Sequence, residues 1–153
     1  QAVKIEGGVR MQPVVSALVA SGIPVMGHIG MTPQSVHQMG GFKMQGRDDA
    51  AREQLQADAL ALEQAGVFSI VLELIPSDLA ARITGQLRVP TIGIGAGPSC
   101  SGQVQVFHDV FGLYEDFVPK HTRRYATVAA AIREAPKAYI SDVTQGKFPE
   151  ARR

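Results

Sequence analysis

The chain has 153 residues, of which 45% are hydrophobic and 19% charged, and its formal net charge is +1. These values are typical of one soluble globular domain, residues 1–153, and they give no reason to expect nucleic acid as a partner. No apolar run approaches the roughly 20 residues that a membrane-spanning helix needs. Cys100 is the only cysteine. Since it has no intrachain partner for a disulfide, we expect a cytoplasmic protein.

Residues 2–6 (AVKIE) are predicted to form the first strand. Lys4 and Glu6 lie two positions apart, so their side chains share one face of that strand. They belong either to the polar face of a half-exposed strand or to a functional site. Because the chain begins directly on a strand without methionine, we expect no signal peptide, and we expect the first part of the fold to be missing.

Residues 13–20 are predicted to be helical, with Pro13 in the first turn, and residues 25–29 are predicted to form the second strand. His28 lies at the carboxyl end of that strand. A histidine there is either a hydrogen-bonded packing residue or a functional residue, since α/β enzymes place chemistry at strand ends. The long connection over residues 34–45 contains two adjacent glycines, and loops of this length are usually functional or specially packed.

The predicted helix over residues 48–65, capped by Asp48 or Asp49, leads into the buried strand over residues 68–75. Glu73 lies inside this apolar run, in the sequence SIVLELIP. A buried carboxylate is costly unless it is paired or used, so Glu73 is either a partner in a structural ion pair or a catalytic group.

The last part of the chain begins with a helix capped by Ser77 or Asp78 and a strand over residues 89–94. The glycines at 93, 95 and 97 lack the spacing of a dinucleotide-binding loop, and they serve either a tight turn or a phosphate. A strand over residues 103–107 and helices from about residue 122 follow. Pro136 is expected to break or restart the last helix, and the tail over residues 142–149 is expected to be a loop.

The alternation of strands and helices predicts an α/β fold with a parallel sheet and helical crossovers. Two architectures fit five such strands. One is an open doubly wound sheet, and the other is the later part of an eight-stranded barrel, which needs about 250 residues.

Six motifs together give a more specific answer. They are KIEGG, PVMGHIGMTPQ, GFKMQGR, VLELIP, PTIGIGAG and GQVQVFHD, at residues 4–8, 24–34, 41–47, 71–76, 90–97 and 102–109. In this order they resemble the ketopantoate hydroxymethyltransferase family, and the resemblance covers essentially the whole chain.

The resemblance implies a (β/α)8 TIM barrel, of which this chain holds about strands 4–8 and the C-terminal helices. It implies transfer of a hydroxymethyl group from 5,10-methylenetetrahydrofolate to 2-oxoisovalerate (3-methyl-2-oxobutanoate), a step towards pantothenate. Mg²⁺ and a homo-oligomer, typically a decamer, are implied as well. By resemblance, Glu73 is the catalytic proton acceptor, Lys4 and His28 lie at the substrate, and Glu6 belongs to the metal site.

These residue types suit that chemistry. A divalent cation chelated by a 2-oxo acid stabilises the enolate that forms when the C3 proton is lost. A buried glutamate is a suitable base for that proton, and the charge of Lys4 attracts the anionic substrate.

The chain departs from the family pattern because the first strands, with two aspartates of the magnesium site, have no counterpart here. We therefore expect an N-terminal companion segment to supply the remaining ligands. A smaller departure is Ser101, where the family pattern leads us to expect an acidic residue. Two alternatives remain: a related metal-dependent barrel that cleaves or forms carbon–carbon bonds in other 2-oxo acids, and a non-catalytic fragment that only assembles with other chains.

Overall fold

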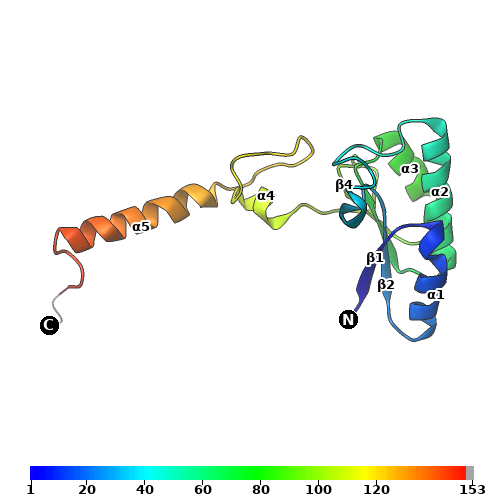
Figure 1. Ribbon diagram of the computed structural model, residues 1–153, viewed down its shortest axis with the longest axis horizontal. Coiled ribbons are helices and arrows are strands. Elements are labelled where there is room, and N and C mark those ends of the chain that lie inside the picture. Colours follow the sequence, from blue (N-terminus) through cyan, green and yellow to red (C-terminus); the bar gives the residue numbers. More distant parts are fainter. Residues whose placement is uncertain (151–153) are drawn as a thin grey trace. The chain divides into compact units, whose positions relative to one another are not determined.

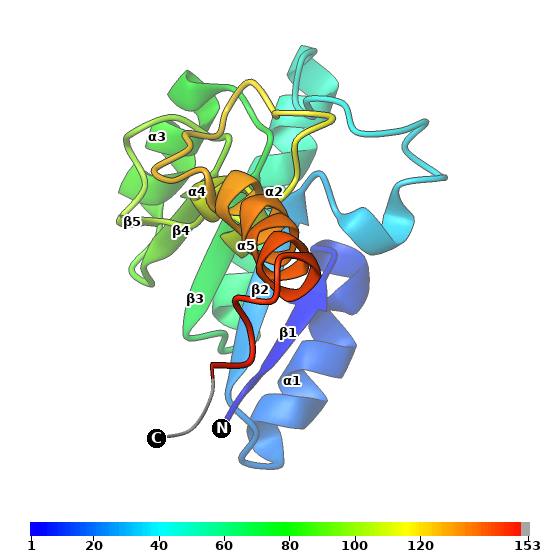
Figure 2. The same ribbon diagram turned by 90° about the vertical axis from the view of Figure 1, so that its left-hand side faces the viewer.

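A parallel sheet of five strands forms the centre of the first part of the chain (Figures 1 and 2). The computed structural model describes residues 1–150, which divide into two compact units, one over residues 1–104 and one from residue 105 on. The strands are β1 (Val3–Glu6), β2 (Val25–Gly30), β3 (Ser69–Glu73), β4 (Thr91–Ile94) and β5 (Gly102–Gln103).

The spatial order of the strands equals their order in the sequence, β1-β2-β3-β4-β5, and each neighbouring pair is parallel. This confirms the predicted α/β fold with a parallel sheet. A doubly wound sheet reverses its strand order at a switch point. No reversal occurs among β1–β5, so the doubly wound alternative was wrong for this unit.

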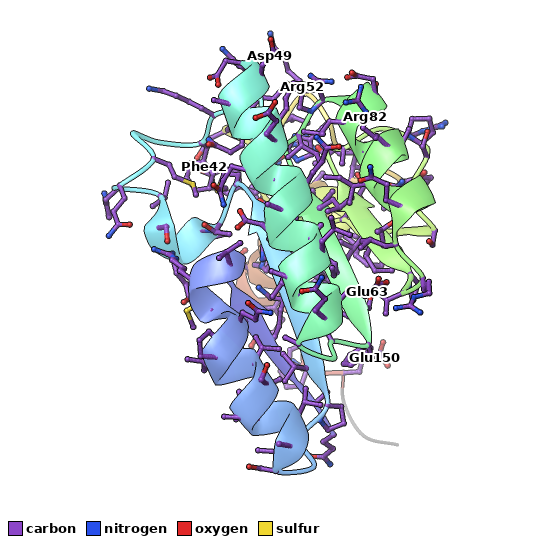
Figure 3. All side chains as sticks on the ribbon, turned by 90° about the vertical axis from the view of Figure 1, so that its right-hand side faces the viewer. Phe42, Asp49, Arg52, Glu63, Arg82 and Glu150 are labelled. Atoms are coloured by element: carbon purple, nitrogen blue, oxygen red, sulfur yellow. The ribbon has the colours of Figure 1, made fainter. Side chains whose placement is uncertain are left out.

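The helices of this unit pack on one face of the sheet. They are α1 (Gln12–Ala20), α2 (Asp49–Gln64) and α3 (Ser77–Gln86), and the short 3-10 helix η1 (Val9–Met11) contacts α1 and α2. A second 3-10 helix, η2 (Pro33–Ser35), follows β2. In Figure 3, α2 lies in front of the sheet, with Asp49 near its start and Glu63 near its end. Each strand is added at the same edge of the sheet, and right-handed crossovers then place successive helices on the same face.

Local sequence explains most of the helix boundaries. Pro13 lies in the first turn of α1, and the Asp48 carboxylate caps α2 by accepting a hydrogen bond of 2.9 Å from the backbone N–H of Ala51. Gly66 follows α2 in the left-handed conformation, as expected of a residue that ends a helix.

The expected cap of α3 was wrong. Pro76 occupies the N-cap position without a side-chain cap, and Ser77 is the first helical residue. Asp78 instead forms an ion pair with Arg52 of α2. Desolvation raises the pKa of the Asp78 carboxyl, but the hydrogen bond and the positive charge of Arg52 outweigh it, so that the pKa is lowered.

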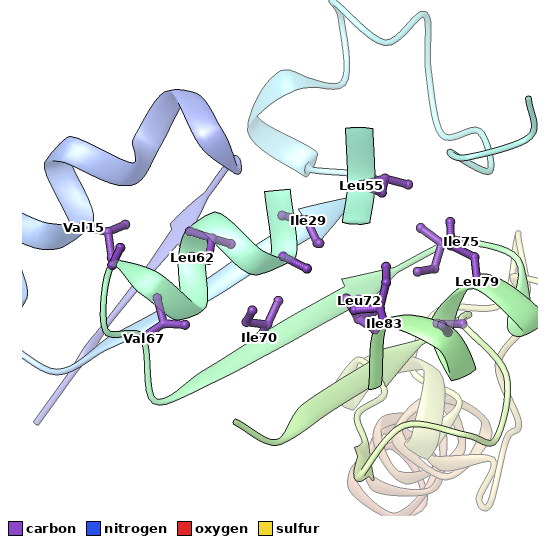
Figure 4. Close-up of a cluster of buried hydrophobic side chains, with 14 of the residues drawn as sticks. Val15, Ile29, Leu55, Leu62, Val67, Ile70, Leu72, Ile75, Leu79 and Ile83 are labelled. Atoms are coloured by element: carbon purple, nitrogen blue, oxygen red, sulfur yellow. The ribbon is translucent and has the colours of Figure 1, made fainter. Parts of the chain in front are cut away.

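The hydrophobic core lies between these helices and the sheet (Figure 4). Side chains alternate along each strand, and alternate residues such as Ile70 and Leu72 of β3 point towards the helices. Gly27 leaves the space that Leu62 of α2 fills, because a Cβ on Gly27 would lie 2.8 Å from Leu62 Cδ1. The largest fully buried aliphatic side chains are Val15, Val25, Ile29, Leu62, Ile70, Leu72, Ile75, Leu79 and Ile83.

The second unit contains α4 (Phe107–Phe111) and α5 (Val128–Thr144). Three expectations for the chain from residue 102 onwards were wrong. The strand predicted over residues 103–107 is limited to β5, and α4 begins at Phe107, within the predicted strand. The last helix begins at Val128 rather than near residue 122. Asp142 and Val143 belong to α5 rather than to a loop.

Pro136 lies inside α5, and the helix continues through it. A proline removes one helical hydrogen bond. Residues 131–140 of α5 are exposed, so water can bind the carbonyl group that loses its partner. None of the helices in residues 1–150 is long and apolar enough to cross a membrane.

Two leucines of α2 provide a test of this core. Leu62 is fully buried and Leu60 is 39% exposed. We expect Leu62→Ala to lower the free energy of unfolding by about 2–5 kcal/mol, because the side chain leaves a cavity. Leu60→Ala should cost less than about 1 kcal/mol. Urea denaturation of both variants measures the difference, and equal losses would contradict the described packing.

Candidate active site

Four ionisable side chains meet on the face of the sheet opposite the helices. They come from β1, β2 and β3, whose carboxyl ends lie at the same edge because the strands are parallel. Glu6 is in register with His28, and Gly30 is in register with Glu73. The alternation along each strand places Lys4, Glu6, His28 and Glu73 on the same face.

Lys4 and Glu6 interact directly, on the shared strand face that their spacing predicted. Lys4 Nζ lies 3.4 Å from Glu6 Oε1. The other carboxylate oxygen, Oε2, accepts a hydrogen bond of 3.0 Å from the backbone N–H of Gln34. The Glu6 side chain is only 7% exposed, whereas that of Lys4 is 43% exposed. Lys4 therefore keeps part of its ammonium group free to meet a ligand.

His28 lies between Lys4 and Glu73. Its Nδ1 atom is 2.9 Å from Lys4 Nζ and 3.7 Å from Glu6 Oε1, and its Nε2 atom is 2.9 Å from Glu73 Oε2. The side chain is 4% exposed. Nε2 and Oε2 are close, yet they are not aligned as in a hydrogen bond, and Nε2 has no other hydrogen-bond partner among the described residues. The imidazole thus connects the lysine to the second glutamate.

The backbone around Glu73 is fixed by three segments. The Glu73 carbonyl accepts a hydrogen bond of 2.8 Å from the N–H of Met31. Leu74 donates to the carbonyl of Ile94 and accepts from the N–H of Gln45, both at 2.9 Å. Leu74 has a φ of +48°, a conformation that costs a non-glycine residue about 1–2 kcal/mol. These hydrogen bonds hold the strained turn that ends β3 immediately after Glu73.

Gly30 is needed for this arrangement. It has a φ of +92°, and a Cβ at this position would lie 2.1 Å from the carbonyl oxygen of Glu73. Only glycine fits so close to a neighbouring backbone. The sequence assigned no role to Gly30 or Leu74. Gly27 and Gly30 flank His28 and Ile29, and a glycine at the end of a strand could have indicated a close backbone approach. Nothing in the sequence distinguished Leu74.

The described residues do not form a complete magnesium site. Among residues 1–150, no group of three or more His, Cys, Asp or Glu side chains is arranged to hold a metal ion. Glu6 supplies one carboxylate of the oxygen type that Mg²⁺ prefers, but one carboxylate is too few for octahedral coordination.

The glycine-rich segment after β4 serves a tight turn. Gly95 and Gly97 have φ values of +64° and +79°. A Cβ on Gly97 would lie 2.4 Å from Cβ of Ser77. Their conformation therefore accounts for both of these glycines without a ligand. Cys100 is half-buried beside Gly93 and packs against the core.

A cavity of about 390 Å³ opens beside the ends of β1 and β2. Part of its wall comes from the long connection predicted over residues 34–45, and part comes from α2. Its lining combines apolar side chains with amides and charges, including Ile29, Met39, Leu55, Arg10, Gln54 and Asp58. A volume of this size is within the range of small-molecule sites.

A lysine, a histidine and two glutamates clustered at the carboxyl edge of a parallel sheet define an α/β protein with a candidate acid–base site. Comparison with known proteins places this protein more narrowly. Residues 1–151 match the model of the family described as ketopantoate hydroxymethyltransferase. The chain belongs to this family, which confirms the resemblance in its sequence motifs.

Several relatives share the same name, 3-methyl-2-oxobutanoate hydroxymethyltransferase. The relative from Chloroflexus aurantiacus is 60% identical over 97% of this chain, and that from Roseiflexus sp. (strain RS-1) is 59% identical over 99%. The relative from Trichlorobacter lovleyi is 57% identical over 97%. The aligned parts are 53%, 54% and 56% of these relatives, so the chain spans about half their length.

Substitution of Gly30 tests the close contact with Glu73. Gly30 and Gly22 both have positive φ, but nothing lies within 4 Å of a Cβ built on Gly22. Gly22→Ala should therefore lower the free energy of unfolding only by the strain of a positive φ, about 1–2 kcal/mol. Gly30→Ala adds a clash with the Glu73 backbone, typically about 1–3 kcal/mol more. Urea denaturation compares the two variants, and an equal effect would show that the clash is absent.

Proposed function

We propose that this chain carries the acid–base site of a 3-methyl-2-oxobutanoate hydroxymethyltransferase. The observation that supports the proposal is the placement of Lys4, His28 and Glu73 on one face at the carboxyl edge of the sheet, in a chain of this family. The reaction transfers a hydroxymethyl group from 5,10-methylenetetrahydrofolate to 3-methyl-2-oxobutanoate and gives ketopantoate, a precursor of pantothenate and coenzyme A.

Glu73 is the base that removes the C3 proton of the keto acid. Its side chain is 14% exposed, so it is shielded from water but open to a ligand on one side. Loss of the C3 proton leaves an enolate. C3 then bonds to the methylene carbon of the folate as one carbon–nitrogen bond of that carbon breaks, and water replaces the second nitrogen, which gives the hydroxymethyl group and releases tetrahydrofolate. The proton that leaves C3 passes to the Glu73 carboxylate, one oxygen of which lies 2.9 Å from Nε2 of His28.

Lys4 binds the anionic keto acid. An ammonium group has three donors. In the structure one faces Nδ1 of His28 and another is directed at Glu6, which leaves one for a substrate oxygen. His28 lies beside the substrate and connects Lys4 with Glu73. The charge of Lys4 favours both the bound carboxylate and the enolate that forms from it.

The proposed complete enzyme is a TIM barrel with Mg²⁺. The sequential strand order and the helices on one face are what a section of such a barrel requires. In this proposal β1–β5 correspond to strands 4–8. Glu6 is one magnesium ligand, and the other ligands belong to a companion segment equivalent to the part of the longer relatives that this chain does not span. Bound Mg²⁺ would stabilise negative charge on the enolate.

The cavity beside α2 and the connection over residues 34–45 is the proposed location for part of the folate co-substrate. Its wall adjoins the segment whose Gln34 N–H binds Glu6, so it borders the candidate site. We also propose a cytoplasmic homo-oligomer, a decamer as the resemblance implies. Apolar side chains on α5, including Ile132, Tyr139 and Ile140, are more than half exposed, as expected of a surface that assembly covers.

Exchange of the C3 hydrogen tests the role of Glu73. We expect Glu73→Gln in the complete enzyme to slow the exchange of this hydrogen with deuterium about 10²–10⁴-fold, because the general base is lost. Glu53→Gln removes the same charge from an exposed position on α2 and should leave the rate unchanged. NMR follows the substrate signal in D₂O. Unchanged exchange in Glu73→Gln would exclude Glu73 as the base.

Substitution of Lys4 tests substrate binding. A hydrogen bond to a charged group contributes about 1.5–3 kcal/mol. We therefore expect Lys4→Gln to raise the KM for 3-methyl-2-oxobutanoate roughly 10- to 100-fold. Lys137→Gln, on the exposed surface of α5, is the matched control. Steady-state kinetics at saturating folate gives both values, and an unchanged KM for Lys4→Gln would place the substrate elsewhere.

A further inference from the structure

We propose that His28 is a positioning residue: Lys4 fixes its imidazole in the Nε2–H tautomer, and this tautomer holds one carboxylate oxygen of Glu73. The identification of Glu73 as the base rests on the proposed function, whereas the tautomer follows from contacts within the chain. Neither family membership nor the sequence motifs specify which ring nitrogen carries the proton.

The contact at Nδ1 is the first argument. Lys4 Nζ lies 2.9 Å from this atom. An ammonium group donates hydrogen bonds and accepts none, so Nδ1 must present its lone pair. Glu6 Oε1 would favour a proton on Nδ1, but its distance of 3.7 Å is too long for a hydrogen bond. The contact with Lys4 therefore determines that Nδ1 carries no proton.

The contact at Nε2 is an independent second argument. Glu73 Oε2 is 2.9 Å away. A carboxylate is an acceptor, so an unprotonated Nε2 would bring two lone pairs together. A proton on Nε2 makes the same contact attractive. The two atoms are not aligned as in an ideal hydrogen bond, which is common in active sites before the substrate binds.

Both contacts thus specify the same tautomer, and burial leaves little room for water to replace either partner. The His28 side chain is 4% exposed. With Nε2 already protonated and Nδ1 occupied by Lys4, the imidazole has no free lone pair for the proton that Glu73 removes from C3. That proton stays on the Glu73 carboxylate. His28 acts through Glu73 by restricting the rotation of its carboxylate.

The tautomer can be measured directly. Solid-state ¹⁵N NMR of the complete enzyme, labelled at histidine nitrogens, separates protonated from unprotonated ring nitrogens. The chain has four histidines, and the signals lost in His28→Gln belong to His28. We expect a protonated Nε2 and an unprotonated Nδ1. A protonated Nδ1 in the neutral ring would overturn the proposal.

Removal of the lysine tests its control of the tautomer. In Lys4→Met, Nδ1 loses its donor, and we expect the Nδ1–H form to rise to a detectable fraction. Lys137→Met is the control, because Lys137 lies on exposed α5 and pairs with Glu134. It should leave the His28 signals unchanged. A pure Nε2–H form in Lys4→Met would overturn the role of Lys4.

Two replacements of His28 test its action on Glu73. The amide of glutamine reaches the position of Nε2, and that of asparagine reaches the position of Nδ1. We expect His28→Asn to exchange the C3 hydrogen about tenfold more slowly than His28→Gln, with KM values for the keto acid within about threefold of each other, because only glutamine can still donate to Glu73.

Equal rates in the two variants, with unchanged circular dichroism, would overturn the positioning role. The proposed function fails in a different way. If the unmodified complete enzyme does not exchange the C3 hydrogen at all, Glu73 is not a base for this substrate. The NMR measurement then still decides whether Lys4 sets the His28 tautomer.

Discussion

The contact of the His28 ring with both Lys4 and Glu73 is the interaction on which the candidate site depends. Burial of a carboxylate costs several kcal/mol unless the charge has a partner. At 14% exposure, Glu73 has the imidazole of His28 as a close polar neighbour, and the imidazole in turn contacts Lys4. The Lys4 side chain remains 43% exposed, so the positively charged group stays in contact with water while the Glu73 carboxylate is shielded.

The sheet allows Lys4, His28 and Glu73 to lie side by side because its two faces have different roles. The helices cover one face, where aliphatic side chains supply most of the stability, and the other face carries the charged groups at its carboxyl edge. The same strands serve both faces through simple alternation. A substitution such as Leu62→Ala therefore changes the core without touching the charged cluster, whereas Gly30 belongs to both, since its missing side chain lets β2 approach Glu73.

The sequence predicted the parallel α/β architecture and the shared face of Lys4 and Glu6, because alternation and apolar runs are local properties. It also pointed to Glu73 and His28, since ionisable residues in buried strands are rare. Their mutual contact could not be predicted, because it depends on the register between β2 and β3, whose paired residues are far apart in the sequence. The predicted break at Pro136 was wrong, because α5 continues through this proline along an exposed stretch. The predicted start near residue 122 was wrong as well, since α5 begins at Val128.

The alternation along β1 has a consequence for how the protein reaches its fold. β1 pairs with β2 over only four residues, and its apolar and charged side chains alternate. A shift of one residue in this pairing would turn Lys4 and Glu6 into the hydrophobic core and Ile5 away from it. Burial of these charges would strongly destabilise the shifted pairing, so the charged side chains of the site also favour the correct alignment of β1 with β2 during folding.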